Sequence, residues 1–186
     1  MLSQASQWLA DDHVALDEVL SQLRKALDIG DVLVTHARLD LFWARLAVHI
    51  RAEHLHLFPA VMNGLSDMTA DQSVAPTLNQ GRLAIGRLRT DHDFFMHELA
   101  HAIGILRDLI KTTDRRAVNE AMRTVRDTVR EIEKRLVIHN ELEEDQIYRW
   151  VKTILNEHEQ ADLATQIKAE LGNRPPRFSQ DTWLNR

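Results

Sequence analysis

Two short stretches of the sequence each place a histidine and a glutamate four residues apart: His49-Ile-Arg-Ala-Glu53 and His139-Asn-Glu-Leu-Glu143. On an α-helix this spacing puts both side chains on one face, one turn apart. If the two helices face each other, two imidazole nitrogens and two carboxylates converge. Donors of these types bind transition-metal ions. Each stretch therefore predicts part of a metal site.

Two further histidines, each preceded by an aspartate, extend this pattern: His13 follows Asp12, and His92 follows Asp91. Apolar residues follow both histidines at the same offsets, so each histidine continues the inner stripe of a helix. Four helices that each send one histidine inward would form a cradle for a pair of metal ions. The two stripes are Leu16, Leu20, Leu23 and Leu27, and Phe95, Leu99, Ala102 and Leu106.

The composition limits the metals and partners that fit. The chain has no cysteine, which excludes thiolate ligands, Fe–S clusters and disulfides. Histidine and carboxylate ligands suit iron, manganese or zinc better than copper(I). The formal charge of −5 lacks the basic field that nucleic acids attract, and no apolar run approaches a membrane span. With no secretory signal pattern at its start, we expect a cytoplasmic protein that binds neither nucleic acid nor membrane.

Apolar periodicity predicts helices throughout, and no segment alternates with the period of two that marks a strand. We expect an all-α fold, an antiparallel up-down four-helix bundle with a short C-terminal fifth helix and an extended tail. The bundle would take up residues 1–156, and residues 157–186 would pack on it or on a partner. The predicted helices are residues 1–29, 32–62, 80–111, 114–155 and 157–171.

Breaks in the pattern set the ends of these helices. Residues 63–79 are rich in Gly, Ser, Asp, Thr and Pro, which predicts a loop across one end of the bundle. Pro59 is expected to kink or end the second helix. In the tail, Trp183 would anchor the chain on the bundle or on a partner chain, which admits a homodimer.

The four inward histidines share one depth in this bundle. Counted from the end near residues 63–79, their positions agree within about 9 Å at roughly 1.5 Å per residue. Burial of four histidines and two glutamates at one level would be costly without a metal. We therefore expect one cluster that holds metal.

Together these motifs resemble the hemerythrin-like, or HHE cation-binding, family over about residues 3–155. The matching features are Asp12-His13, His49-xxx-Glu53 leading to Leu57-Phe58-Pro59, Asp91-His92, and His139-xxx-Glu143 followed by Glu144. The resemblance implies a non-haem di-iron centre with an oxo or hydroxo bridge, in a protein that binds or reacts with dioxygen, nitric oxide or peroxide in sensing, storage or stress response. The ligands that it implies are His13, His49, Glu53, His92, His139 and Glu143, with the two glutamates bridging.

The chain departs from the oxygen-carrying members at one ligand. Oxygen carriers have a fifth histidine four residues after the one on the third helix, and this chain has Met96 there. Four histidines and two glutamates are closer to the nitric-oxide-responsive and iron-centre-repair relatives. An open coordination position favours reactivity over reversible oxygen carriage.

Other histidines compete for these roles. His97 and His101 could replace His92, but at about 100° per residue they lie on other faces of the helix, and the His92 face continues as better core. His56, one turn beyond Glu53, is a candidate extra ligand, hydrogen-bonding partner of a ligand or capping residue. Zinc or manganese could also stand in place of iron.

Three more assignments concern the surroundings of the site and rival functions. His54 is expected on the polar surface, and Asp17 is expected to orient His13. A metal-free interaction module that docks through the tail is one alternative, and a ferritin-like di-iron oxidase, which uses Glu-xx-His on two helices, is another. The ferritin-like ligands would be Glu53-xx-His56, Glu98-xx-His101, Glu18 and Glu141.

Overall fold

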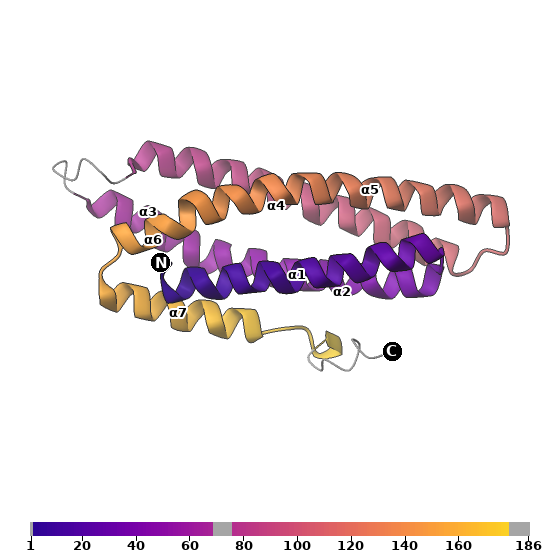
Figure 1. Ribbon diagram of the computed structural model, residues 1–186, viewed down its shortest axis with the longest axis horizontal. Coiled ribbons are helices and arrows are strands. Elements are labelled where there is room, and N and C mark those ends of the chain that lie inside the picture. The colour runs from indigo at the N-terminus through magenta and orange to yellow at the C-terminus, as the bar shows by residue number, and fades with distance from the viewer. Residues whose placement is uncertain (1, 69–75, 179–186) are drawn as a thin grey trace.

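The computed structural model describes residues 2–68 and 76–178, which form an antiparallel bundle of four rods with a shorter helix beside it (Figure 1). The second and fourth rods each combine two α-helices joined by a π-helical turn. This arrangement confirms the all-α bundle with a short C-terminal helix. The elements are α1 (Gln4–Ile29), α2 (Val32–Ala52), η1 (Glu53–Leu57), α3 (Phe58–Asp67), α4 (Leu78–Leu109), α5 (Arg115–Leu142), η2 (Glu143–Ile147), α6 (Tyr148–Ile154), α7 (Glu157–Gly172) and the 3₁₀ turn η3 (Pro176–Phe178).

Five of the helices begin at a polar N-capping side chain. Each cap accepts a hydrogen bond from a backbone N–H of the first turn, which satisfies a donor that the helix itself leaves unpaired. Gly30 ends α1 at a φ of 80°, a left-handed conformation that suits glycine. The N-capping residues are Ser3, Asp31, Thr77, Asp114 and Asn156.

The second rod runs further than its sequence predicts. Pro59 does not end it, because Pro59 lies at the start of α3, directly after the π turn. There the N–H of Phe58 bonds to the carbonyl of Glu53, five residues back. The prediction that residues 63–79 form a loop is wrong at both ends, since α3 continues to Asp67 and α4 begins at Leu78. Residues 69–75 lie outside the described part of the chain.

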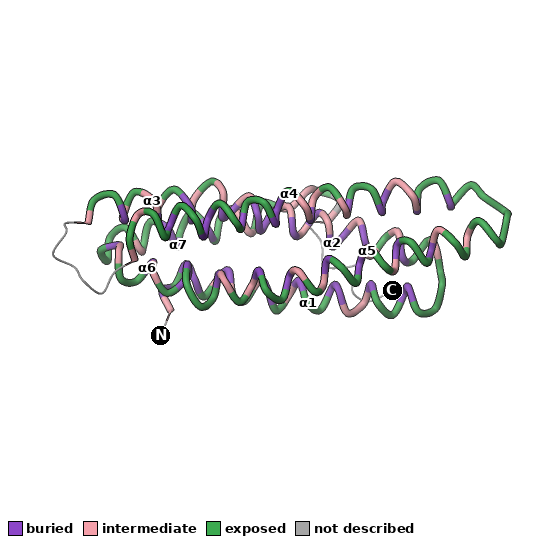
Figure 2. The backbone as a smooth tube through the Cα atoms, turned by 90° about the horizontal axis from the view of Figure 1, so that it is seen from above, coloured by how far each residue is buried: buried purple, intermediate pink, exposed green. Residues whose placement is uncertain are grey.

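Two apolar cores fill the bundle, one on each side of a polar layer. The first includes Leu16, Phe95 and Leu136, and the second includes Leu9 and Leu88. Along each rod the inward histidines fall between members of the two cores. Buried positions line the inner faces of the rods (Figure 2).

Helix α7 packs against α1 and α2 (Figure 1). Its buried residues are apolar, and Arg51 of α2 pairs with Glu170 and donates to the carbonyl of Asn173 at 2.9 Å.

The predicted anchor Trp183 and the tail beyond Phe178 lie outside the described residues. None of the described helices is both long and apolar enough to cross a bilayer.

Candidate metal centre

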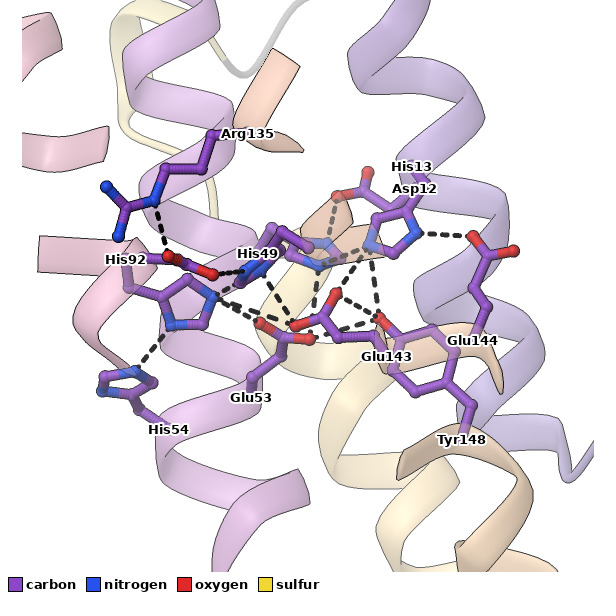
Figure 3. A network of polar contacts seen from close by, with 12 residues as sticks. Asp12, His13, His49, Glu53, His54, His92, Arg135, Glu143, Glu144 and Tyr148 are labelled. Carbon is purple, nitrogen blue, oxygen red and sulfur yellow. Dashed lines mark hydrogen bonds and ion pairs between the residues drawn. The ribbon is translucent and has the colours of Figure 1, made fainter. Parts of the chain in front are cut away.

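Six side chains from all four rods meet in the polar layer (Figure 3). Two pairs of histidines approach each other through their Nε2 atoms. His13 and His49 are 3.1 Å apart, and His92 and His139 are 3.0 Å apart. All six residues, the other two being Glu53 and Glu143, are at most 5% exposed. The structure thus brings together every residue of the predicted ligand set.

Glu53 reaches both histidine pairs at once. Its Oε1 lies 3.5 Å from the Nε2 of His49, and its Oε2 lies 3.3 Å from the Nε2 of His92. The carboxylate therefore offers one oxygen to each pair.

Glu143 repeats this arrangement from the opposite rod. Its Oε2 lies 3.2 Å from His13 and its Oε1 lies 3.1 Å from His139. In the described part of the chain, Glu143 Oε1 and Glu53 Oε2 are buried, and their nearby imidazole nitrogens do not meet the geometry of a hydrogen bond. Poorly satisfied buried carboxylate oxygens are costly, and a cation would satisfy them. The donor set therefore fits a pair of metal ions bridged by two carboxylates.

Aspartates hold the outer nitrogens of two histidines. His49 Nδ1 lies 3.1 Å from Asp12, and His139 Nδ1 lies 3.3 Å from Asp91. Each aspartate thus contacts a histidine of the neighbouring rod rather than the histidine beside it in the sequence. Arg45 donates to Asp12 at 2.9 Å, and an equivalent arginine holds Asp91. Such partners fix the ring orientation of a ligating histidine.

The other two histidines have different outer partners. His13 Nδ1 lies 2.8 Å from the carboxylate of Glu144, whereas His92 Nδ1 lies 2.9 Å from His54 Nε2. The expectation that His54 lies on the polar surface is wrong, because its ring is half-buried against Phe58. Its position directly after Glu53 turns it toward α4, just as Glu144 turns toward α1.

Tyr148 is a residue of the centre that the sequence motifs missed. Its hydroxyl lies 3.3 Å from His13 Nε2 and can donate to Glu53 Oε1 at 3.2 Å or to Glu143 Oε2 at 3.4 Å. The side chain is fully buried. Five residues separate it from Glu143, and that spacing faces inward only because η2 is a π turn. On a regular α-helix it would point elsewhere, so the spacing gave no signal.

Charge pairing sets the protonation of the cluster. Burial alone would lower the pKa of His13, His49 and His139, but the nearby carboxylates outweigh burial and raise the pKa of all three. Burial alone would raise the pKa of Glu53 and Glu143, and the repulsion between them raises that of Glu143, but the histidines outweigh these effects and lower both. The glutamates are therefore carboxylates, ready to bind a cation.

The pKa of Tyr148 is raised well above its ordinary value, first by burial and then by the charges of Glu143 and Glu53. Tyr148 is thus a neutral hydroxyl among these groups. It can serve as a hydrogen-bond donor to either carboxylate.

The rival candidates lie outside the cluster. His97 and His101 are exposed, so His92 is the inward histidine of α4. His56 is half-buried and its Nε2 faces Glu170 of α7 at 3.8 Å, because the π turn rotates it away from the centre. Asp17 is exposed. The ferritin-like set is not assembled, since its remaining members Glu18 and Glu141 are exposed as well.

A small cavity adjoins the cluster. It measures about 10 Å³, roughly the space that the centre of one water molecule needs. Three of the four histidines line it together with a mainly apolar wall. Its lining residues are His13, Leu16, Asp17, Phe42, Leu46, His49, Leu136, His139 and Asn140.

Comparison with known proteins identifies the family. A family model described as the Hemerythrin HHE cation binding domain matches residues 4–151, a span that contains all six clustered residues. No curated protein and no solved structure matched the chain. Since this model covers most of the chain, the protein belongs to the hemerythrin HHE cation-binding domain family.

Proposed function

We propose that the protein holds two iron ions in a non-haem centre and uses them to bind or react with a small molecule. His13 and His49 would hold one ion, and His92 and His139 the other. Glu53 and Glu143 would bridge the two positions, because each offers one oxygen to each histidine pair. This double-facing geometry of the two carboxylates is the observation that carries the proposal.

The chemistry of the donors is compatible with iron. Four imidazoles and two carboxylates are borderline and hard ligands, which suit iron, manganese and zinc. When bound, an iron pair would supply redox chemistry toward dioxygen, nitric oxide or peroxide. Met96 stands one turn after His92, and its thioether is a poor ligand for iron. Each ion would thus have two histidines and the two shared carboxylates, which would leave a coordination position at either ion for an outside molecule.

The surroundings of the cluster favour a small uncharged molecule. The adjoining cavity has space for about one water molecule, and its wall includes Leu16, Phe42 and Leu46. The aliphatic and aromatic part of this wall disfavours charged species. From the opposite side of the polar layer, where the second core lies, Tyr148 can donate a hydrogen bond into the cluster. These features support a role in sensing, storage or stress response that involves such a molecule.

Metal analysis and an absorption spectrum of aerobically purified protein test the proposal. We expect two iron ions per chain and near-ultraviolet charge-transfer bands. Stoichiometric zinc without such bands would overturn the redox function. The variant Glu98→Gln separates this centre from a ferritin-like one, because it should leave iron content unchanged here.

A further inference from the structure

The two helix pairs of the bundle present the same polar pattern. α1 corresponds to α4, and the rod of α2 corresponds to the rod of α5, with one set of offsets from the inward histidines. This correspondence allows each side of the centre to be compared position by position. The matching residues are Asp12 and Asp91, His13 and His92, Arg45 and Arg135, His49 and His139, and Glu53 and Glu143.

One side of the centre, the seam between α2 and α4, is closed by apolar side chains. Trp43 and Met96 pack against the first core, and Ile50 is buried in it. Trp43 stands six residues before His49, and Ile50 stands one residue after it. Met96 stands four residues after His92. A ligand would have to displace packed side chains to pass here.

The other side, the seam between α1 and α5, has polar residues at the same three offsets. Glu133, Asp17 and Asn140 replace the tryptophan, the methionine and the isoleucine. This seam forms a surface groove of about 630 Å³ that also reaches His13 and Glu144. The α1–α5 seam is therefore an open groove at the positions where apolar side chains fill the α2–α4 seam.

The groove and the cavity at the cluster share part of their lining. Four residues line both spaces, namely His13, Asp17, Leu136 and Asn140. Asp17 and Asn140 are the polar pair among them, one on each helix. They stand between solvent and the His13–His49 pair.

We propose that small molecules reach the centre through the α1–α5 groove, with Asp17 and Asn140 as its inner gate and the α2–α4 seam closed. The inference rests on the proposed function, because it concerns the ligands of that centre. It makes the His13–His49 half the one that meets the incoming molecule. Neutral diatomic molecules or peroxide fit the narrow inner end, and larger solutes stop at the gate.

The test places the apolar residues of the closed α2–α4 seam at the matching positions of the α1–α5 seam. Asp17→Met combined with Asn140→Ile should slow both association and dissociation of nitric oxide, added as the probe to the iron(II)-loaded protein, by about tenfold. Stopped-flow absorbance measures both rates. The dissociation constant, the iron content and the iron spectrum should stay the same, since a gate changes rates and not the bound state.

Two further variants complete the experiment. Glu18→Met makes the same change in charge at an exposed position of α1 outside the groove, and it should leave the rates unchanged. Asp17→Ala with Asn140→Ala widens the gate and should not slow either rate. Normal iron content with unchanged rates in the Met/Ile variant would overturn the access route alone. An unmodified chain that takes up no iron would overturn the proposed function and this inference with it.

Discussion

The His13–His49 pair and the His92–His139 pair have the same inner contacts and different neighbours. Tyr148 places a hydroxyl beside the first pair, and Phe58, at the matching position, places only a ring beside the second. The outer partner is Glu144 in the first half and His54 in the second. The repeated pattern therefore builds two matching candidate sites for metal, and the departures from it collect polar groups on one side.

The comparison also links the centre to its surface. The half that has the tyrosine hydroxyl also faces the α1–α5 groove, while the other half faces packed apolar side chains. The tyrosine hydroxyl and the groove therefore belong to the same half of the centre. Under the proposed access route, the His13–His49 half would meet the ligand first.

The largest effect should come from a residue that both halves share. Glu143→Ala removes an oxygen from each histidine pair and should abolish binding of both metal ions, whereas His139→Ala should cost mainly one. Metal content after dialysis measures the difference. Glu98→Gln is the matched control, because it removes a carboxylate from α4 outside the cluster. Loss of a single ion in Glu143→Ala would contradict the bridging role.

A smaller effect should come from the aspartates that orient one histidine of each half. Asp12→Asn and Asp91→Asn should each weaken metal affinity by about 10- to 100-fold, because His49 or His139 loses its fixed ring orientation. Competition with a chromophoric chelator measures the affinity. Asp11→Asn, one residue away and exposed, should have no effect. Equal affinities in all three variants would show that the aspartates do not position the rings.

Tyr148→Phe makes the two halves alike. Metal content should be retained, and the reaction rate with peroxide or nitric oxide should fall by about tenfold or more, since a buried hydrogen-bond donor at the reacting side is lost. The reciprocal Phe58→Tyr adds a hydroxyl beside the other pair and should not restore the rate in the double variant. Unchanged rates in Tyr148→Phe would mean that the asymmetry has no chemical role.

The smallest effect is a pH dependence that metal should reverse. In protein stripped with a chelator, Glu53 helps to raise the pKa of His49 against the effect of burial. The stabilisation from such pairs is fully present below about pH 6.5 and is lost as pH rises through the raised pKa. Metal needs unprotonated rings, so its stabilisation should grow over the same range.

Thermal unfolding at pH 6 and pH 9, with chelator and with saturating metal, measures these opposite trends. The variant His36→Gln changes a histidine outside the cluster and should keep both. A stripped protein that gains stability between these two pH values would contradict the charge pairing in the cluster.

Much of the centre follows from the sequence because its helices are regular up to the glutamates. The shared offsets after His13 and His92 identify the inner faces, and exposure of His97 follows from the same geometry. The sequence shows Asp12 and Asp91 beside two of the histidines, but it does not show which histidines the two aspartates contact. Asp12 contacts His49 across the rods, which only tertiary packing decides.

Beyond the glutamates the sequence misled for one physical reason. A period of about 3.6 residues assumes an unbroken α-helix, and both rods change to a π turn at this point. The turn brings Phe58 and Tyr148 inward at five residues from their glutamates, and it turns His56 toward α7. The end of the second rod was misplaced in the same region, because Pro59 is tolerated directly after such a turn.

Each π turn amounts to one residue inserted in an otherwise ordinary helix. Removal of a single residue usually rotates all later side chains of a helix by about 100° and ruins its packing. At exposed Leu55 or Asp145 the same removal would convert the wide turn into a normal one and leave Phe58 and Tyr148 facing the core. A deletion of one residue from either rod should therefore disturb the packing least at its π turn, beside the cluster.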